Sequence, residues 1–83
     1  MRIALLQCLP GAADLAAGLA RLDGCATAAA TSGATLLVTP EMFLTGYAIG
    51  ADAVARLAEP ADGPAAQAVV AICRTHGTAV LYG

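Results

Sequence analysis

The chain has 83 residues, of which 59% are hydrophobic and 12% are charged, and its formal net charge is −2. A chain this short forms at most one small domain, and its high apolar content predicts apolar faces that a further part of the protein or a second subunit covers. Its four cationic residues are scattered arginines, which excludes the basic surface needed to bind nucleic acid or an anionic membrane.

The first predicted element is a strand at residues 2–8, a leucine-rich run that the turn signal Pro10-Gly11 ends. A helix follows, for which Asp14 is the candidate N-cap. Ser32-Gly33 marks the end of this helix. Its apolar stripe recurs at helical spacing and consists of Leu15, Leu19, Leu22 and Ala26.

Four residues of this helix that lie outside the apolar stripe are interpreted individually. Gly18 and Gly24 each weaken a helix by about 1 kcal/mol relative to alanine. Alternatively, their small size allows the helix to pack closely against the sheet. Arg21 and Asp23 are predicted to be solvated.

The second predicted strand, residues 34–39, is continuously apolar at 36–38, as in a strand buried on both faces. Pro40 ends it, because proline has no N–H to donate to a neighbouring strand. A strand, a helix and a second strand in this order predict a right-handed parallel crossover.

A short helix is predicted next, from Asp52 as its N-cap to residue 58, with Val54 and Leu57 facing inward. Pro64 suits the first turn of a longer helix. Gly77 ends that helix, and a strand-like run occupies residues 78–82. The order β-α-β-α-β, with one additional short helix, indicates a single α/β domain with no internal boundary.

Glu41 is the candidate functional residue, because it stands directly after the end of the second strand. Open α/β sheets place their chemistry at the carboxyl ends of such strands. Apolar walls formed by Met42, Phe43 and Leu44 would disfavour the charged form of this carboxylate, which suits a general base. The alternative interpretation is a solvated glutamate that starts a loop.

Two aromatic residues are candidates for a substrate pocket beside Glu41, namely Phe43 and Tyr47. For Tyr47 a structural interpretation is also open. Gly46-Tyr47 is typical of a turn with the aromatic ring packed beneath it and the hydroxyl bonded to a partner.

The segment from Pro40 to Tyr47, following an apolar strand, resembles the glutamate motif of the nitrilase superfamily, the carbon–nitrogen hydrolases. Residues 1–7 resemble the first strand of that family, and residues 59–64 resemble the entry to its second long helix. The resemblance implies an α-β-β-α sandwich built from two facing sheets. Residues 1–83 would form a partial domain, its amino-terminal third, with both long helices on one side of the sheet and the other side bare.

The same resemblance implies a Glu–Lys–Cys triad in which Glu41 is the catalytic glutamate. The chain contains no lysine, and the family's nucleophilic cysteine lies downstream of these residues, so we expect the 83-residue chain alone to be inactive. For the full-length protein, the implied activity is hydrolysis of a small amide or carbamoyl substrate by a homo-oligomer that uses no cofactor. The alternative is a non-catalytic α/β fragment or interaction module.

Two other residues have both a catalytic and a structural interpretation. His76 is the only histidine and stands in the last turn of a predicted helix, where a cation interacts favourably with the helix dipole. Cys8 ends the first strand. The three cysteines, Cys8, Cys25 and Cys73, form no metal-ligand spacing and are typical of reduced, buried thiols.

No segment has the character of a membrane span or a signal peptide. The longest uncharged run, residues 24–40, is interrupted by threonine, serine and glycine and falls short of a spanning helix. The apolar run at residues 3–7 is too brief for the hydrophobic region of a signal peptide. We therefore expect a cytoplasmic protein.

Overall fold

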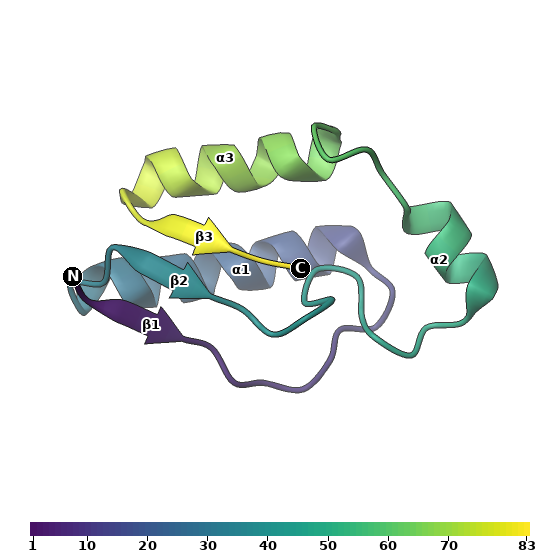
Figure 1. Ribbon diagram of the computed structural model, residues 1–83, viewed down its shortest axis with the longest axis horizontal. Coiled ribbons are helices and arrows are strands. Elements are labelled where there is room, and N and C mark those ends of the chain that lie inside the picture. The colour runs from purple at the N-terminus through teal and green to yellow at the C-terminus, as the bar shows by residue number, and fades with distance from the viewer.

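The computed structural model describes residues 1–83 as a three-stranded parallel sheet with three helices (Figure 1). The elements follow the chain in the order β1 (Ile3–Leu5), α1 (Leu15–Thr31), β2 (Leu36–Val38), α2 (Ala51–Leu57), α3 (Pro64–His76) and β3 (Ala79–Leu81). The predicted order of strands and long helices is confirmed.

The sheet has the spatial order β1-β2-β3, so β2 is its central strand. Each strand is shorter than predicted, with three residues. Backbone pairing continues only slightly further, because Leu6 N donates to Val38 O at 2.9 Å and Thr39 N donates to Leu81 O at 3.0 Å. Pro40 follows at once and has no N–H to continue the pairing.

The ends of the two long helices lie where the sequence predicts them. The Asp14 side chain accepts a hydrogen bond from Ala17 N at 3.0 Å and so caps α1. Pro64 begins α3, and Gly77 ends it in the left-handed conformation, at φ 64°. These local signals therefore determine where both helices begin and α3 ends.

The short helix α2 differs from its prediction. It begins after Gly50, and Asp52 lies within its first turn instead of capping it. Gly50 has φ 89°, a conformation that aspartate adopts less readily, so the chain turns into the helix two residues earlier. No residue of α2 is buried, but Val54 and Leu57, the two residues predicted to face inward, line a cleft together with Met42 and Ile49. In Figure 1, α2 stands at one end of the molecule, apart from the sheet.

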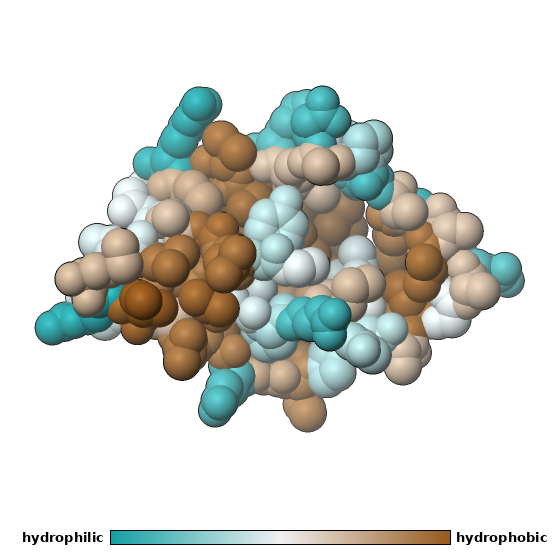
Figure 2. Space-filling view, in the orientation of Figure 1, coloured by the Kyte–Doolittle hydropathy of each residue, from teal (hydrophilic) through white to brown (hydrophobic).

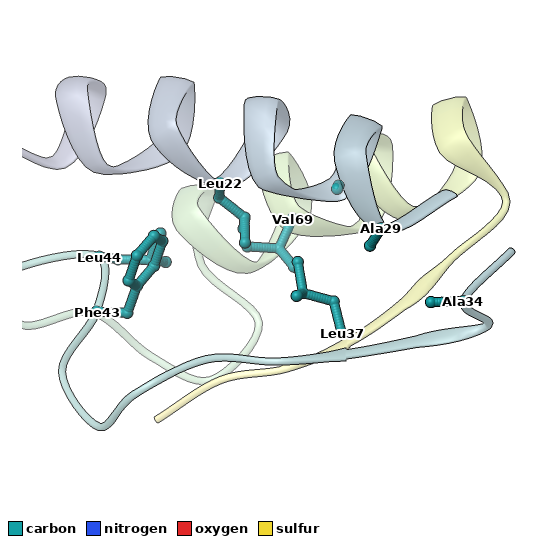
Figure 3. Packing of buried hydrophobic residues seen from close by; sticks show 8 residues of the cluster. Leu22, Ala29, Ala34, Leu37, Phe43, Leu44 and Val69 are labelled. Atoms are coloured by element: carbon teal, nitrogen blue, oxygen red, sulfur yellow. The ribbon is translucent and has the colours of Figure 1, made fainter. Parts of the chain in front are cut away.

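Helices α1 and α3 pack against each other and against the same face of the sheet, as predicted (Figure 3). The central strand contributes Leu37 to the core between them. The remaining core residues come from both helices and from the chain before and after β2; they are Leu22, Ala26, Ala29, Ala34, Phe43, Leu44 and Val69.

The opposite face of the sheet is bare, as the resemblance implies. Leu5 is 73% exposed and Leu81 is 59% exposed. Figure 2 shows this apolar surface facing the viewer, over the three strands. In β2 only Leu37 is buried, so the prediction of a strand buried on both faces does not hold within these 83 residues. No helix combines the length and hydrophobicity needed to cross a membrane.

Candidate active site

Glu41 lies at the carboxyl edge of the sheet, where the chain leaves the central strand β2. The end of the chain passes beside it, since a Cβ placed on Gly83 would lie 3.8 Å from Glu41 Cγ. The predicted position of this carboxylate, at the carboxyl ends of parallel strands, is therefore confirmed.

The expected apolar enclosure of Glu41 is absent from these residues. Glu41 is exposed, whereas Phe43 is 2% exposed and Leu44 is buried in the core. The cause is the backbone of Met42, which has a left-handed φ of 55° and turns the chain so that Glu41 and the two apolar residues diverge. Within these 83 residues, Glu41 is therefore a solvated glutamate, which is the alternative interpretation of the sequence.

The turn that carries Glu41 is held by backbone contacts. Gly46 N donates to Met42 O at 2.8 Å, and Ala13 N donates to Thr45 O at 2.9 Å. Gly46 has φ 99°, and a Cβ at this position would lie 2.5 Å from Gly11 O, so only glycine fits here. The turn is therefore fixed to the loop that precedes α1.

Helix α1 also contacts this turn directly. A Cβ on Gly18 would lie 2.2 Å from Leu44 O, so the absence of a side chain lets the helix approach the turn closely. Gly24, in the same helix, has no neighbouring atom within 4 Å of such a Cβ. Close packing is therefore the correct interpretation for Gly18 but not for Gly24, and the turn after β2 is what Gly18 contacts.

A cleft of about 130 Å³ lies beside Glu41. It brings together the three residues that the sequence assigns to the site, namely Glu41, Phe43 and Tyr47. Its other lining residues come from the loop after β1, from α1 and from the start of the turn; they are Cys8, Leu9, Pro10, Arg21 and Pro40. Substrate pockets usually have volumes of about 300–1,000 Å³, so this cleft is smaller than a typical substrate pocket.

The structural interpretation of Tyr47 is wrong. Its side chain is 62% exposed, so the ring is not packed beneath the turn. The turn buries Phe43 and Leu44 instead, and the space beneath it is filled by these two residues and Leu22 (Figure 3). Tyr47 is left on the cleft side of the turn.

Arg21 is the residue of this site that the sequence analysis missed. Its guanidinium carbon lies 4.5 Å from the centroid of the Phe43 ring, and its Nη2 donates to Leu9 O at 3.3 Å. Arg21 is exposed, as predicted, but it also makes these two contacts, which the prediction of a solvated side chain does not include. One feature of the sequence could have indicated this contact. Arg21 stands three residues after Gly18, which places both residues on one face of the helix.

The model of the family described as carbon-nitrogen hydrolase matches residues 2–83. The chain belongs to this family. A protein of Pseudomonas protegens, described as a hydrolase in the pqqF 5′ region, is 54% identical over 83 residues, which cover all of this chain and 28% of that relative. The chain thus spans less than a third of the length of the curated relative it matches. A comparison with solved structures finds no match.

Two cysteines of this carbon–nitrogen hydrolase chain lie near the cleft. Cys8 is exposed and lines it, so the prediction of a buried thiol is wrong for this residue, and Cys25 and Cys73 are only half-buried. Burial raises the pKa of the Cys25 thiol, the nearby Cys8 adds to this rise, and the Arg21 guanidinium opposes it. A raised pKa keeps Cys25 protonated, which makes it a poor nucleophile. No group of three or more histidine, cysteine, aspartate or glutamate side chains is placed to hold a metal ion.

His76 lies at the other edge of the sheet, where α3 ends and the chain enters β3. Its Nε2 is 2.7 Å from Asp23 Oδ1, so it joins the end of α3 to α1. This contact favours the structural interpretation of His76. It also corrects the prediction for Asp23, which pairs with the histidine rather than being only solvated.

Proposed function

We propose that the full-length protein carrying this chain hydrolyses a non-peptide C–N bond of a small amide or carbamoyl substrate, with Glu41 as the general base. The observation that carries the proposal is the place of Glu41, exposed on a fixed turn at the carboxyl end of the central strand, in a chain of the carbon–nitrogen hydrolase family. The cleft that Glu41 shares with Phe43 and Tyr47 would form one wall of the substrate pocket.

In the proposed reaction, the Glu41 carboxylate takes the proton of a cysteine thiol, and the thiolate attacks the carbonyl carbon. The C–N bond breaks, and the proton on Glu41 passes to the leaving nitrogen. Glu41 then takes a proton from water as the water oxygen attacks the thioester carbonyl. The C–S bond breaks, the acid leaves, and Glu41 returns the proton to the cysteine thiolate. A lysine would stabilise the negative charge that develops on the carbonyl oxygen. The cysteine and the lysine would both be supplied from outside residues 1–83.

The exposure of Glu41 supports this assignment. A general base must come within about 2.6–3.2 Å of the atom whose proton it takes, and the open side of Glu41 leaves room for a thiol from another segment. The bare sheet face supports the α-β-β-α sandwich, in which a second sheet of the full-length protein would cover Leu5 and Leu81. That second sheet would also enclose the cleft.

An amide or carbamoyl substrate is preferred to a nitrile for one reason. The continuation after Glu41, from Phe43 to Tyr47, resembles the amidase members of the superfamily more closely than the nitrilases. In the structure, this stretch contributes both aromatic residues of the cleft. A substrate bound in this cleft would lie beside the stretch whose sequence resembles the amidases.

The substitution Glu41→Gln in the full-length protein tests the proposal. It preserves the shape of the side chain and removes the base, and loss of a general base typically lowers the rate by about 10²–10⁴-fold. Release of ammonia or amine from aliphatic amides and carbamoyl compounds is the measurement. We expect kcat to fall by at least this factor, because the same carboxylate serves both steps.

The matched control is Glu59→Gln, the other glutamate of the chain. Glu59 Oε1 accepts a hydrogen bond from Ala65 N at 2.8 Å, and the glutamine side chain retains an oxygen that can accept it. Wild-type turnover in Glu41→Gln, or an equal loss in both variants, would contradict the assignment of Glu41 as the base.

A further inference from the structure

Arg21 joins three segments that meet beside Glu41. Its side chain leaves α1 and reaches the loop after β1, where Nη2 donates to Leu9 O at 3.3 Å and lies 3.7 Å from Cys8 Sγ. On its other side the guanidinium lies over the Phe43 ring, 4.5 Å from the centroid. Phe43 stands two residues after Glu41, so Arg21 contacts the turn that carries the proposed base.

This turn depends on its surroundings because its backbone is strained. Met42 is one of two non-glycine residues with a positive φ, and it separates Glu41 from Phe43. A left-handed conformation at a residue with a side chain persists only where neighbouring contacts hold it. Rotation of the backbone at Met42 would change the direction of the Glu41 carboxylate relative to the buried Phe43. The contacts of Phe43 therefore control where Glu41 points.

We infer that Arg21 is a positioning residue for the reaction: it holds the Phe43 ring against α1 and thereby fixes the turn at Met42 and the direction of Glu41. This inference rests on the proposed function of Glu41. Arg21 forms no ion pair with Glu41, and the ion pair in the chain is that of His76 with Asp23. Its effect on the carboxylate therefore passes through Phe43, while Leu9 O anchors the guanidinium.

A guanidinium is suited to this position for a physical reason. Its flat face stacks on an aromatic ring, while the N–H groups at its edge remain available to donate hydrogen bonds. Arg21 uses the face for Phe43 and the edge for Leu9 O. A lysine ammonium can interact with the ring but lacks the planar group that makes both contacts at once. An uncharged side chain of similar length retains only apolar packing.

The first test is the kinetics of Arg21→Met in the full-length enzyme. Methionine keeps apolar contact with Phe43 and removes both the charge and the donors. A base displaced by about 1 Å costs up to about 10²-fold in rate, so we expect kcat to fall by about tenfold or more while KM stays within about twofold. Arg21→Lys should recover part of the loss. A merely structural role would lower the thermal midpoint and the yield of folded enzyme, but not kcat per active site.

The second test does not require turnover. Gly46 N donates to Met42 O at 2.8 Å, and hydrogen exchange of the Gly46 amide therefore reports opening of the turn. We expect exchange in Arg21→Met to be about tenfold faster at Gly46 and unchanged in α3. The matched control is Arg74→Met, an exposed arginine in the last turn of α3, which should leave both exchange and kcat at wild-type values.

The inference requires both the faster exchange and the lower kcat, and the absence of either overturns it. If Arg21→Met does not fold, the same two measurements are made on Arg21→Lys. Faster exchange at Gly46 together with a reduced kcat supports the positioning role. An exchange rate and a kcat equal to those of the wild type overturn it. If the wild-type protein hydrolyses no C–N bond, the proposed function fails. In that case the exchange rate at Gly46 still decides whether Arg21 holds the turn.

Discussion

Gly18 illustrates how one residue of α1 has opposite effects in a helix alone and in this fold. Alanine is more favourable than glycine in a helix interior by about 1 kcal/mol. At position 18, however, the new Cβ would lie 2.2 Å from the carbonyl oxygen of Leu44. Since that oxygen belongs to the backbone of the turn carrying Glu41, the turn or the helix must shift. The tertiary contact therefore outweighs helix propensity at this position.

We expect Gly18→Ala to destabilise the full-length protein by about 1–3 kcal/mol, the usual cost of overpacking. Gly24→Ala, in the same helix and with no atom within 4 Å of the new Cβ, should instead stabilise it by up to about 1 kcal/mol. Denaturant unfolding of both variants is the measurement. Stabilisation by Gly18→Ala would show that the turn does not pack on α1 as described.

At the scale of the element, α3 depends on a side chain outside the helix. Gly63 precedes it and provides no side-chain cap, and Pro64 begins it without an N–H. Glu59 supplies the missing acceptor, with Oε1 2.8 Å from Ala65 N. A carboxylate at this end also interacts favourably with the helix dipole. The second glutamate of the chain therefore stabilises a helix, whereas the first lies at the candidate active site.

The change Glu59→Ala should destabilise α3 by about 1 kcal/mol, as loss of a cap does. Glu59→Gln should cost less, because its amide oxygen can still accept the bond from Ala65 N. Thermal or denaturant unfolding of the full-length variants, together with hydrogen exchange at Ala65, measures the effect. Equal stability of Glu59→Ala and the wild type would contradict the capping role.

At the scale of the whole molecule, the bare face of the sheet dominates the behaviour of the 83-residue chain. The strands pair in register, which aligns two apolar rows across this face. One row consists of Ile3, Leu36 and Ala79, and the other of Leu5, Val38 and Leu81. Exposed apolar surfaces of this kind promote association. The core on the other face, between α1, α3 and Leu37, is complete without them.

We therefore expect purified residues 1–83 to bind a hydrophobic dye and to self-associate in sedimentation experiments. The substitution Leu5→Lys should reduce both effects, because it places a charge on the exposed face without touching the core. Leu22→Ala should not reduce them, since Leu22 is buried on the opposite side. A monomer that binds no dye would contradict this prediction.

Much of the fold could be predicted because its signals are local. Asp14 and Gly77 mark helix ends through their own conformational preferences, and Pro40 stops the central strand because it lacks an N–H. The start of the short helix is less predictable from the sequence, since it depends on the positive φ of Gly50. The position of Glu41 after the central strand follows from the same local signals.

The sequence by itself thus determined the order of the elements, the family resemblance, and the residue that stands at the carboxyl end of the central strand. Only the tertiary structure decided how that residue is presented. The left-handed backbone of Met42 exposes Glu41 and buries Phe43, and a positive φ at methionine is not predictable from local preference. The contact of Arg21 with Phe43 joins residues 22 positions apart in the sequence (43 − 21). Such contacts arise only when the helix packs on the sheet, which is why the sequence alone does not reveal that the exposed Arg21 contacts Phe43.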